Sequence, residues 1–151
     1  MTLSEKDRDT LIKYRIEQAH EAIEDAELSI NHHKLKMAVN RIYYGMFYIL
    51  SALALKYKFK TSKHQGLIGW FTKNFLKDKK IDRKYGTILR DAFNNRSEGD
   101  YGAFIKFVKA DVIKSFEDMK DFIYTIEQCI DKPIIEREDK EDNEAVPDVS
   151  A

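Results

Sequence analysis

Apolar residues recur at alternating spacings of four and three positions early in this chain, which places them on one face of an α-helix. The stripe consists of Ile12, Ile16, Ala19, Ile23, Ala26 and Ile30. Only six glycines and two prolines interrupt the 151 residues, and no alternating apolar–polar stretch is long enough to indicate a strand. The pattern predicts an all-α protein, an up-down bundle of four to five helices.

End signals divide this pattern into separate helices. Ser4, with Asp7 in the first turn, indicates an N-cap, and Ser62 with Gln65 has the spacing of a capping box. Gly99 suits the C′ position that follows a helix. The second helix is apolar over much of its circumference, which predicts a central position. The predicted helices are residues 4–30, about 36–57, a short one from 62, about 82–98, and one from about 104–108 to 130.

The helical pattern stops near residue 130, so we predict one bundle domain at residues 1–130. Residues 131–151 are acidic and without periodicity, which predicts a flexible tail. The single cysteine, Cys129, excludes an internal disulfide framework. His20 and Glu24 have the spacing of a helical metal pair, but a surface His–Glu pair is the simpler interpretation. We therefore predict no metal site and no cofactor.

The charge is distributed unevenly along the chain, although 26 basic and 26 acidic residues cancel. Residues 34–90 contain 14 basic and two acidic residues, a net charge of +12, and the flanking segments are acidic. Such a segment attracts phosphate groups, or it forms a solvated lysine-rich surface. The longest largely apolar stretch, residues 42–55, is too short to span a bilayer. We expect a cytoplasmic protein without membrane contact.

Two groups of polar residues are candidates for ligand binding. Arg41 and Tyr44 share a face of the apolar second helix, where a guanidinium needs an acid, carbonyl groups or a ligand anion. The second group lies along the predicted fourth helix and at its end. Arginine suits phosphate binding, and tyrosine can stack on a base. Its members are Arg90, Asn94, Arg96, Ser97, Asp100 and Tyr101. For both groups the alternative is a structural salt bridge, such as one between Arg41 and Asp100.

His64 and Lys63 stand at the predicted start of the third helix. A helix N-terminus favours anions, so both residues are candidates for phosphate binding. The alternative for His64 is an ordinary surface position.

Four elements of the sequence, in order and in spacing, resemble the small prokaryotic HEPN-domain proteins. Residues 38–47, AVNRIYYGMF, resemble their RxYYxMF helix, and residues 62–66, SKHQG, resemble their SKHxG element. Residues 85–86, YG, and residues 96–102, RSEGDYG, resemble their YG…RxxxDYG element. The resemblance covers about residues 9–130. It implies an all-α bundle that forms a homodimer, with the polar motif close to the dimer cleft.

The resemblance also implies a partner and a chemistry. Many members of the family act in toxin–antitoxin pairs with a minimal nucleotidyltransferase. The catalytic members are metal-independent RNases whose motif is an arginine followed four to six residues later by a histidine. Here Arg96 fits the arginine, but Tyr101 takes the nearest position for the histidine. Tyrosine has a reference pKa of about 10 and histidine of about 6.5, so Tyr101 is a poor general base.

These observations give three hypotheses. In the first, the protein is a non-catalytic or weakly catalytic module that binds a nucleotide or RNA, with a nucleotidyltransferase partner. Its ligand residues would be Arg41, Tyr44, Lys63, Arg90, Asn94, Arg96, Asp100 and Tyr101. In the second, it is an RNase toxin in which Arg96 works with a proton from Tyr101, or from His64 if the fold brings His64 near Arg96. In the third, Arg41, Asp100 and Arg96 form only a structural network.

Overall fold

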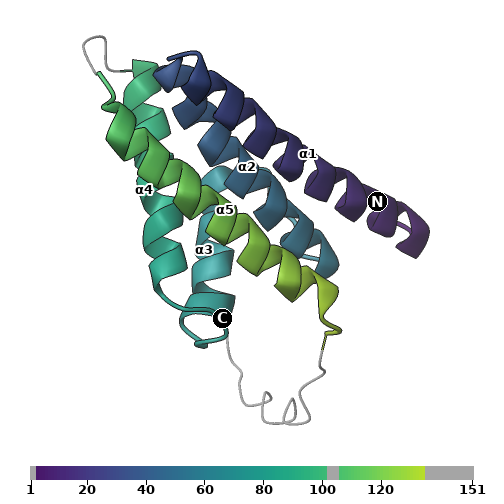
Figure 1. Cartoon of the computed structure of the whole chain (residues 1–151). Helices are drawn as coiled ribbons and strands as arrows, with labels where there is room; N and C mark the ends of the chain where they lie inside the picture. Colours follow the sequence, from purple (N-terminus) through teal and green to yellow (C-terminus); the bar gives the residue numbers. More distant parts are fainter. Residues whose placement is uncertain (1–2, 102–105, 135–151) are drawn as a thin grey trace.

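The computed structural model describes residues 3–101 and 106–134, and within them the chain is all-α, as the sequence predicts (Figure 1). Five α-helices and one π-helical turn follow one another, and no strand occurs in these two ranges. Most of the predicted acidic tail, from residue 135 onward, lies outside the described residues. The elements are α1 (Glu5–Asn31), α2 (Leu35–Lys56), α3 (His64–Phe71), η1 (Thr72–Leu76), α4 (Lys84–Tyr101) and α5 (Lys109–Asp131).

Helix α1 begins and ends as predicted. The Ser4 hydroxyl accepts a hydrogen bond of 3.0 Å from the Asp7 N–H, which satisfies one of the free donors of the first turn. The helix ends at Asn31, and His33 has a φ of 59°, in the left-handed region. This tight turn returns the chain as α2, which packs antiparallel against α1 (Figure 1).

Helix α2 is the centre of the bundle and packs against α1, α3, α4 and α5. Its largest core side chains, including Tyr43, Met46 and Ile49, have no exposed surface. Among the described residues α2 is also the one helix long and apolar enough to cross a membrane, yet its neighbours bury 61% of that stretch. Its apolar composition is therefore explained by its central position in the bundle.

Gly45 allows α2 to approach its neighbours closely. A Cβ at this position would overlap the Met119 side chain of α5 and lie 3.1 Å from the Cβ of Ala22 in α1. Small residues on α1, such as Ala19 and Ala26, are likewise fully buried. The absence of side-chain bulk at these positions sets the short distances between the three long helices.

The third helical segment differs from its prediction in two ways. The capping box at Ser62 is wrong, because the N-cap is Lys63 and no side chain caps the helix. The Thr61 hydroxyl accepts from the Lys63 N–H at 3.2 Å, so the chain stays extended for one more residue and α3 begins at His64. The segment then continues as the π-helical turn η1, in which the Lys77 N–H donates to the Thr72 carbonyl at 2.9 Å.

Helix α4 begins after Asp82, whose carboxylate accepts from the Lys84 N–H at 2.8 Å. It continues to Tyr101, so the prediction that Gly99 follows the helix is wrong. A glycine inside a helix costs only about 1 kcal/mol relative to alanine, and flanking turns can carry it. Helix α5 then covers α2, and the Lys56 ammonium of α2 donates to the carbonyl groups of Ile130 and Lys132 at the end of α5.

Candidate functional site

Helices α2, α3 and α4 bring four side chains together. Tyr44, His64 and Arg96 are predicted site residues, and Tyr43 joins them. A terminal nitrogen of the Arg96 guanidinium donates to the Tyr44 hydroxyl at 3.1 Å. The same guanidinium lies over both tyrosine rings of α2, with its carbon 5.7 Å from the Tyr43 centroid and 5.3 Å from that of Tyr44. His64 of α3 contacts the same pair of rings, at centroid distances of 5.6 and 6.0 Å. We call Arg96, Tyr43, Tyr44 and His64 the Arg96 cluster.

His64 is fixed in this cluster rather than exposed on the surface. Its Nδ1 shares a hydrogen bond of 2.8 Å with the Tyr43 hydroxyl, and its ring lies 4.1 Å from the ring of Phe47. Partial burial, and then the nearby Arg96 charge, lower the pKa of His64 below its ordinary value of 6.5. The imidazole is therefore neutral at neutral pH, with one nitrogen held by Tyr43.

Tyr43 is the fully buried member of the cluster. Desolvation raises the pKa of its hydroxyl far above the ordinary value, although the Arg96 charge acts in the opposite direction. The hydroxyl thus stays protonated at any physiological pH. Its bond to His64 fixes the orientation of the imidazole ring through a side chain with no exposed surface.

Arg41 places a second guanidinium close to Tyr44. Its guanidinium carbon lies 5.4 Å from the Tyr44 centroid. Two of its nitrogens donate to the Asn40 side-chain oxygen, at 3.0 and 3.3 Å. Arg41 therefore has an amide partner rather than a carboxylate among the described residues, and two guanidinium groups lie within 5.4 Å of the Tyr44 centroid. Two guanidinium groups beside one aromatic ring make this part of the surface locally positive.

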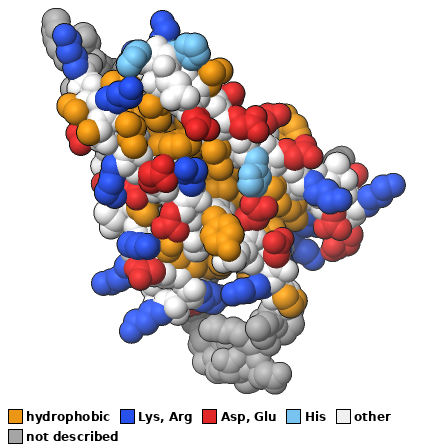
Figure 2. All heavy atoms as spheres, in the orientation of Figure 1, with side chains coloured by type: hydrophobic (Ala, Val, Ile, Leu, Met, Phe, Trp, Pro, Cys, Tyr) orange, Lys and Arg blue, Asp and Glu red, His pale blue; other side chains and the backbone are white. Residues whose placement is uncertain are grey.

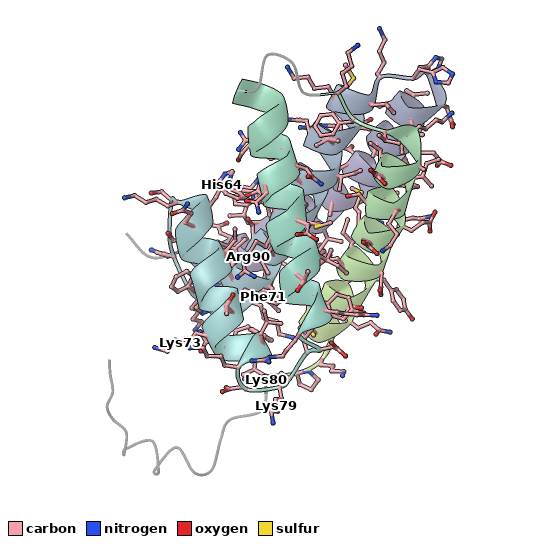
Figure 3. All side chains as sticks on the ribbon, turned by 90° about the vertical axis from the view of Figure 1, so that its left-hand side faces the viewer. His64, Phe71, Lys73, Lys79, Lys80 and Arg90 are labelled. Carbon is pink, nitrogen blue, oxygen red and sulfur yellow. The ribbon has the colours of Figure 1, made fainter. Side chains whose placement is uncertain are left out.

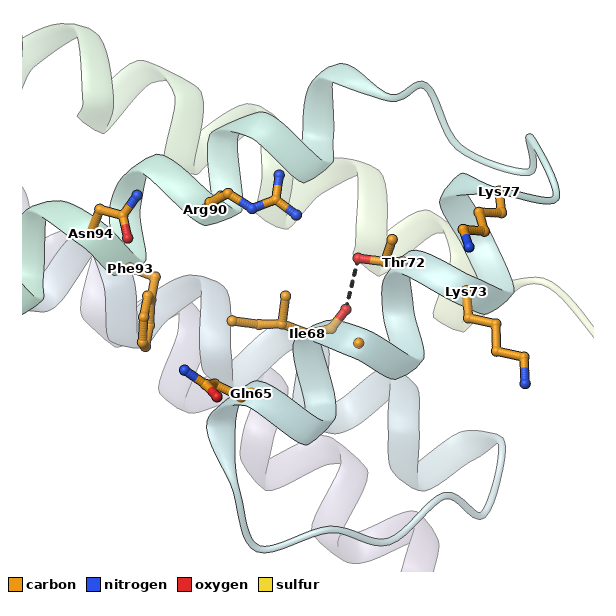
Figure 4. Close-up of a pocket in the computed structure, with 9 residues that line it drawn as sticks. Gln65, Ile68, Thr72, Lys73, Lys77, Arg90, Phe93 and Asn94 are labelled. Atoms are coloured by element: carbon orange, nitrogen blue, oxygen red, sulfur yellow. Dashed lines mark hydrogen bonds between the residues drawn. The ribbon is translucent and has the colours of Figure 1, made fainter. Parts of the chain in front are cut away.

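Arg90 and Asn94 lie elsewhere on α4, in a cleft of about 440 Å³ between α3–η1 and α4 (Figure 4). Lys63 occupies the N-cap position of α3 and lines a different hollow, near Arg15 and Phe59, so it lies in neither the Arg96 cluster nor this cleft. The side chains of Asp100 and Tyr101 lie outside the described residues. We call the first hollow the basic cleft; its polar lining is Gln65, Thr72, Lys73, Lys77, Arg90 and Asn94.

Several residues at or beside these two surfaces were not predicted as site residues, among them two aromatic residues and two lysines. Tyr43 and Phe47 occupy positions that the apolar pattern of α2 assigns to packing, and only the adjacent tyrosine pair signals a polar role for Tyr43. Lys73 and Lys77 belong to the basic segment, in which their spacing alone does not distinguish them from other lysines.

The described residues contain no group of three or more side chains able to hold a metal ion. The ion-pair partner of His20 is not Glu24, the residue one turn farther along its own helix. The His20 Nε2 instead lies 2.7 Å from a carboxylate oxygen of Glu127, which links α1 to α5.

Comparison with known proteins places this geometry in a family. The profile of the HEPN domain matches residues 12–133, a range that includes the Arg96 cluster and the basic cleft. A UPF0332 protein of Thermotoga maritima is 34% identical over 125 residues, which cover 83% of this chain and 95% of that protein. Two proteins of Methanocaldococcus jannaschii, each named "Putative toxin", also match.

The first of these two is 36% identical over 94 residues, or 62% of this chain and 64% of its own. The second is 32% identical over 99 residues, or 66% of this chain and 74% of its own. The helical bundle, the profile match along most of the chain and the similarity to these relatives all indicate the same family. The chain belongs to the HEPN domain family.

Proposed function

We propose that this protein binds RNA through a phosphate group held at the Arg96 cluster. The observation that carries the proposal is the convergence of Arg96 and His64, from two different helices, on the Tyr43–Tyr44 pair. A guanidinium presents paired N–H donors that match two phosphate oxygens. Arg41 supplies a second positive charge beside Tyr44, and aromatic rings next to bound phosphate offer a surface on which a base can stack.

The proposal includes a homodimer and a minimal nucleotidyltransferase as partner, in a toxin–antitoxin type of system. The resemblance to paired HEPN proteins motivates this assignment, and the relatives named as toxins support it. A nucleotide is the alternative ligand, because it offers the same phosphate chemistry to the same guanidinium groups.

The test is direct binding of labelled single-stranded RNA and of ATP to the purified protein, at about 50 mM and about 200 mM salt. We expect RNA to bind at the lower concentration and to bind several-fold more weakly at the higher one, because phosphate contacts release counterions. Binding of ATP alone would assign the site to nucleotides. If neither ligand binds at low salt, the proposal is wrong.

A second candidate function, metal-independent RNA cleavage, is favoured by the position of His64. The motif histidine is missing after Arg96 in the sequence, but His64 reaches the same cluster from α3. A neutral imidazole can accept the proton of a ribose 2′-hydroxyl whose oxygen attacks phosphorus, while Arg96 stabilises the charge on the phosphate. The P–O5′ bond then breaks, and the leaving 5′-oxygen takes a proton from water to give a 2′,3′-cyclic phosphate and a 5′-hydroxyl. The fold thus supplies a histidine that the linear motif lacks.

Under this second function, His64→Gln is expected to abolish cleavage while RNA affinity changes less than about threefold. In the wild type the cleavage rate should rise with pH at acid pH, with the midpoint of the rise below 6.5, because the pKa of His64 is lowered and the imidazole loses its proton at lower pH. The measurement is the fraction of labelled RNA cleaved, without added metal, across this pH range. Intact RNA after prolonged incubation with the wild type rules cleavage out.

A further inference from the structure

The basic cleft carries positive charge that no described carboxylate balances. Its charged lining residues, Lys73, Lys77 and Arg90, are all basic. An adjoining hollow of about 300 Å³ shares Lys77 and Arg90 and adds Arg83. None of these four side chains forms an ion pair with a described residue. The groove therefore attracts anions, whereas the face seen in Figure 2 carries side chains of both signs.

The π-helical turn builds one wall of this cleft. The hydrogen bond from Lys77 to Thr72 spans five residues, and Lys73 and Lys77 both line the hollow (Figure 4). The Thr72 hydroxyl donates to the Ile68 carbonyl at 2.9 Å, which stabilises the junction between α3 and η1. Isolated π-helical turns occur frequently at functional sites, where they redirect side chains. Here the turn places Lys73 and Lys77 in the lining of the cleft that Arg90 of α4 also lines.

The basic cleft adjoins the Arg96 cluster through Phe93 and Gln65. Phe93 lines the cleft, and its ring lies 5.7 Å from the ring of Tyr43. Gln65, at the other wall, directly follows His64 in the chain. Figure 3 shows His64 at one end of this face, with Arg90 and then Lys73 farther along it. The cluster and the cleft thus form one path along α3 and α4.

The spacing along α4 suits neighbouring phosphates of one strand. Arg90 and Arg96 are six residues apart in the sequence, which corresponds to about 9 Å along a helix axis. A stacked strand advances about 3.4 Å per nucleotide, so about two or three nucleotides span this distance. Helical register places Phe93 between the two arginines around the helix, where its half-buried ring is available to a base.

We infer that the basic cleft binds the phosphates that flank the one held by Arg96, so that a single RNA strand runs from the Arg96 cluster along α4 toward Lys73 and Lys77. Arg90 is the first cation on this path, and Lys73 and Lys77 follow on the opposite wall. The inference rests on the proposed function, since it extends the same ligand from the same site. In this arrangement the cleft increases the affinity for RNA and sets the length of RNA that the protein contacts.

The experiment compares a short RNA of about three nucleotides with a long one of about ten nucleotides, which alone is long enough to reach the far wall. The test variant is Lys73→Gln with Lys77→Gln. The control is Lys79→Gln with Lys80→Gln, which removes the same charge from exposed positions that line neither hollow (Figure 3). Affinities of wild type and both variants are measured at several salt concentrations.

We expect the test variant to bind the long RNA at least about fivefold more weakly, with a salt dependence lower by about 1.4 in slope for two lost contacts. Its affinity for the short RNA, and the affinities of the control for both, should change less than about twofold. An equal loss of RNA affinity in both double variants would mean that the lysines act only through the general positive charge of the surface, and it would overturn the inference. If the short RNA binds and the long one gains nothing, the cleft assignment alone is wrong; if neither binds, the proposed function is wrong as well.

Discussion

Replacing Arg96 with alanine is expected to lower RNA affinity by about ten- to a hundredfold, because hydrogen bonds to charged groups contribute about 1.5–3 kcal/mol each. Arg96 donates to Tyr44 and lies over two aromatic rings, so its guanidinium is already oriented before a ligand arrives. Arg96→Lys keeps the charge but loses the planar pair of donors, and we expect an intermediate affinity. The measurement is the Kd for labelled RNA at low salt.

Arg15→Ala is the matched control for this substitution. Arg15 also lies over a tyrosine ring, 5.8 Å from the Tyr14 centroid, and donates to Gln18, but it belongs to α1 and not to the Arg96 cluster. Its removal should leave RNA affinity within about twofold of the wild type. Equal losses in both variants would contradict a specific role for Arg96.

Thermal unfolding of Arg96→Ala separates the binding role from a purely structural one. Loss of its contacts with the two rings should cost about 1–2 kcal/mol of unfolding free energy. A buried ion-pair network would instead cost about 3–5 kcal/mol on breaking. A loss of this larger size, with no change of melting temperature on adding RNA to the wild type, would favour the structural hypothesis.

Replacing Phe122 with alanine is expected to destabilise the fold by about 3–5 kcal/mol, since it removes a large side chain from a closed core. Phe122 has no exposed surface, and its ring lies 5.9 Å from that of Phe71 and 6.3 Å from that of Tyr85. It therefore links α5 to α3 and α4. The expected fall in melting temperature is on the order of 10 °C.

Tyr124→Ala is the control on the same helix. This side chain is 64% exposed, so its truncation should change the unfolding free energy by about 0.5 kcal/mol or less. Both variants are compared by thermal and urea unfolding. A Phe122 variant as stable as the Tyr124 variant would contradict the packing of α5 described above.

The helices could be predicted from sequence because their signals are local. Periodic apolar residues and the Ser4 cap determined α1, and the central position of α2 followed from its composition. The predicted start of α3 and the predicted end of α4 are wrong by a few residues. Local contacts, such as the hydrogen bond between Thr61 and Lys63, decide where a helix begins or ends. A π-helical turn leaves no comparable pattern in the residue sequence.

The candidate site was predicted in its residue types and only partly in its arrangement. Arg96 and Tyr44 were identified and do meet, but they are 52 positions apart in the chain. The approach of His64 to Arg96 depends on how α3 docks, which no linear spacing encodes. Asp100 and Tyr101 keep their predicted roles as hypotheses, because their side chains lie outside the described part of the chain.

Tyr43 belongs to the interior and to the candidate site at once. Its ring fills the space between α2, α3 and α4, while its hydroxyl holds the imidazole of His64. Selection for a stable fold and selection for ligand handling therefore act on one side chain, the first through its ring and the second through its hydroxyl. A lineage that exchanged this tyrosine for phenylalanine would keep its packing and release the histidine, a direct route by which stability and activity can diverge in such proteins.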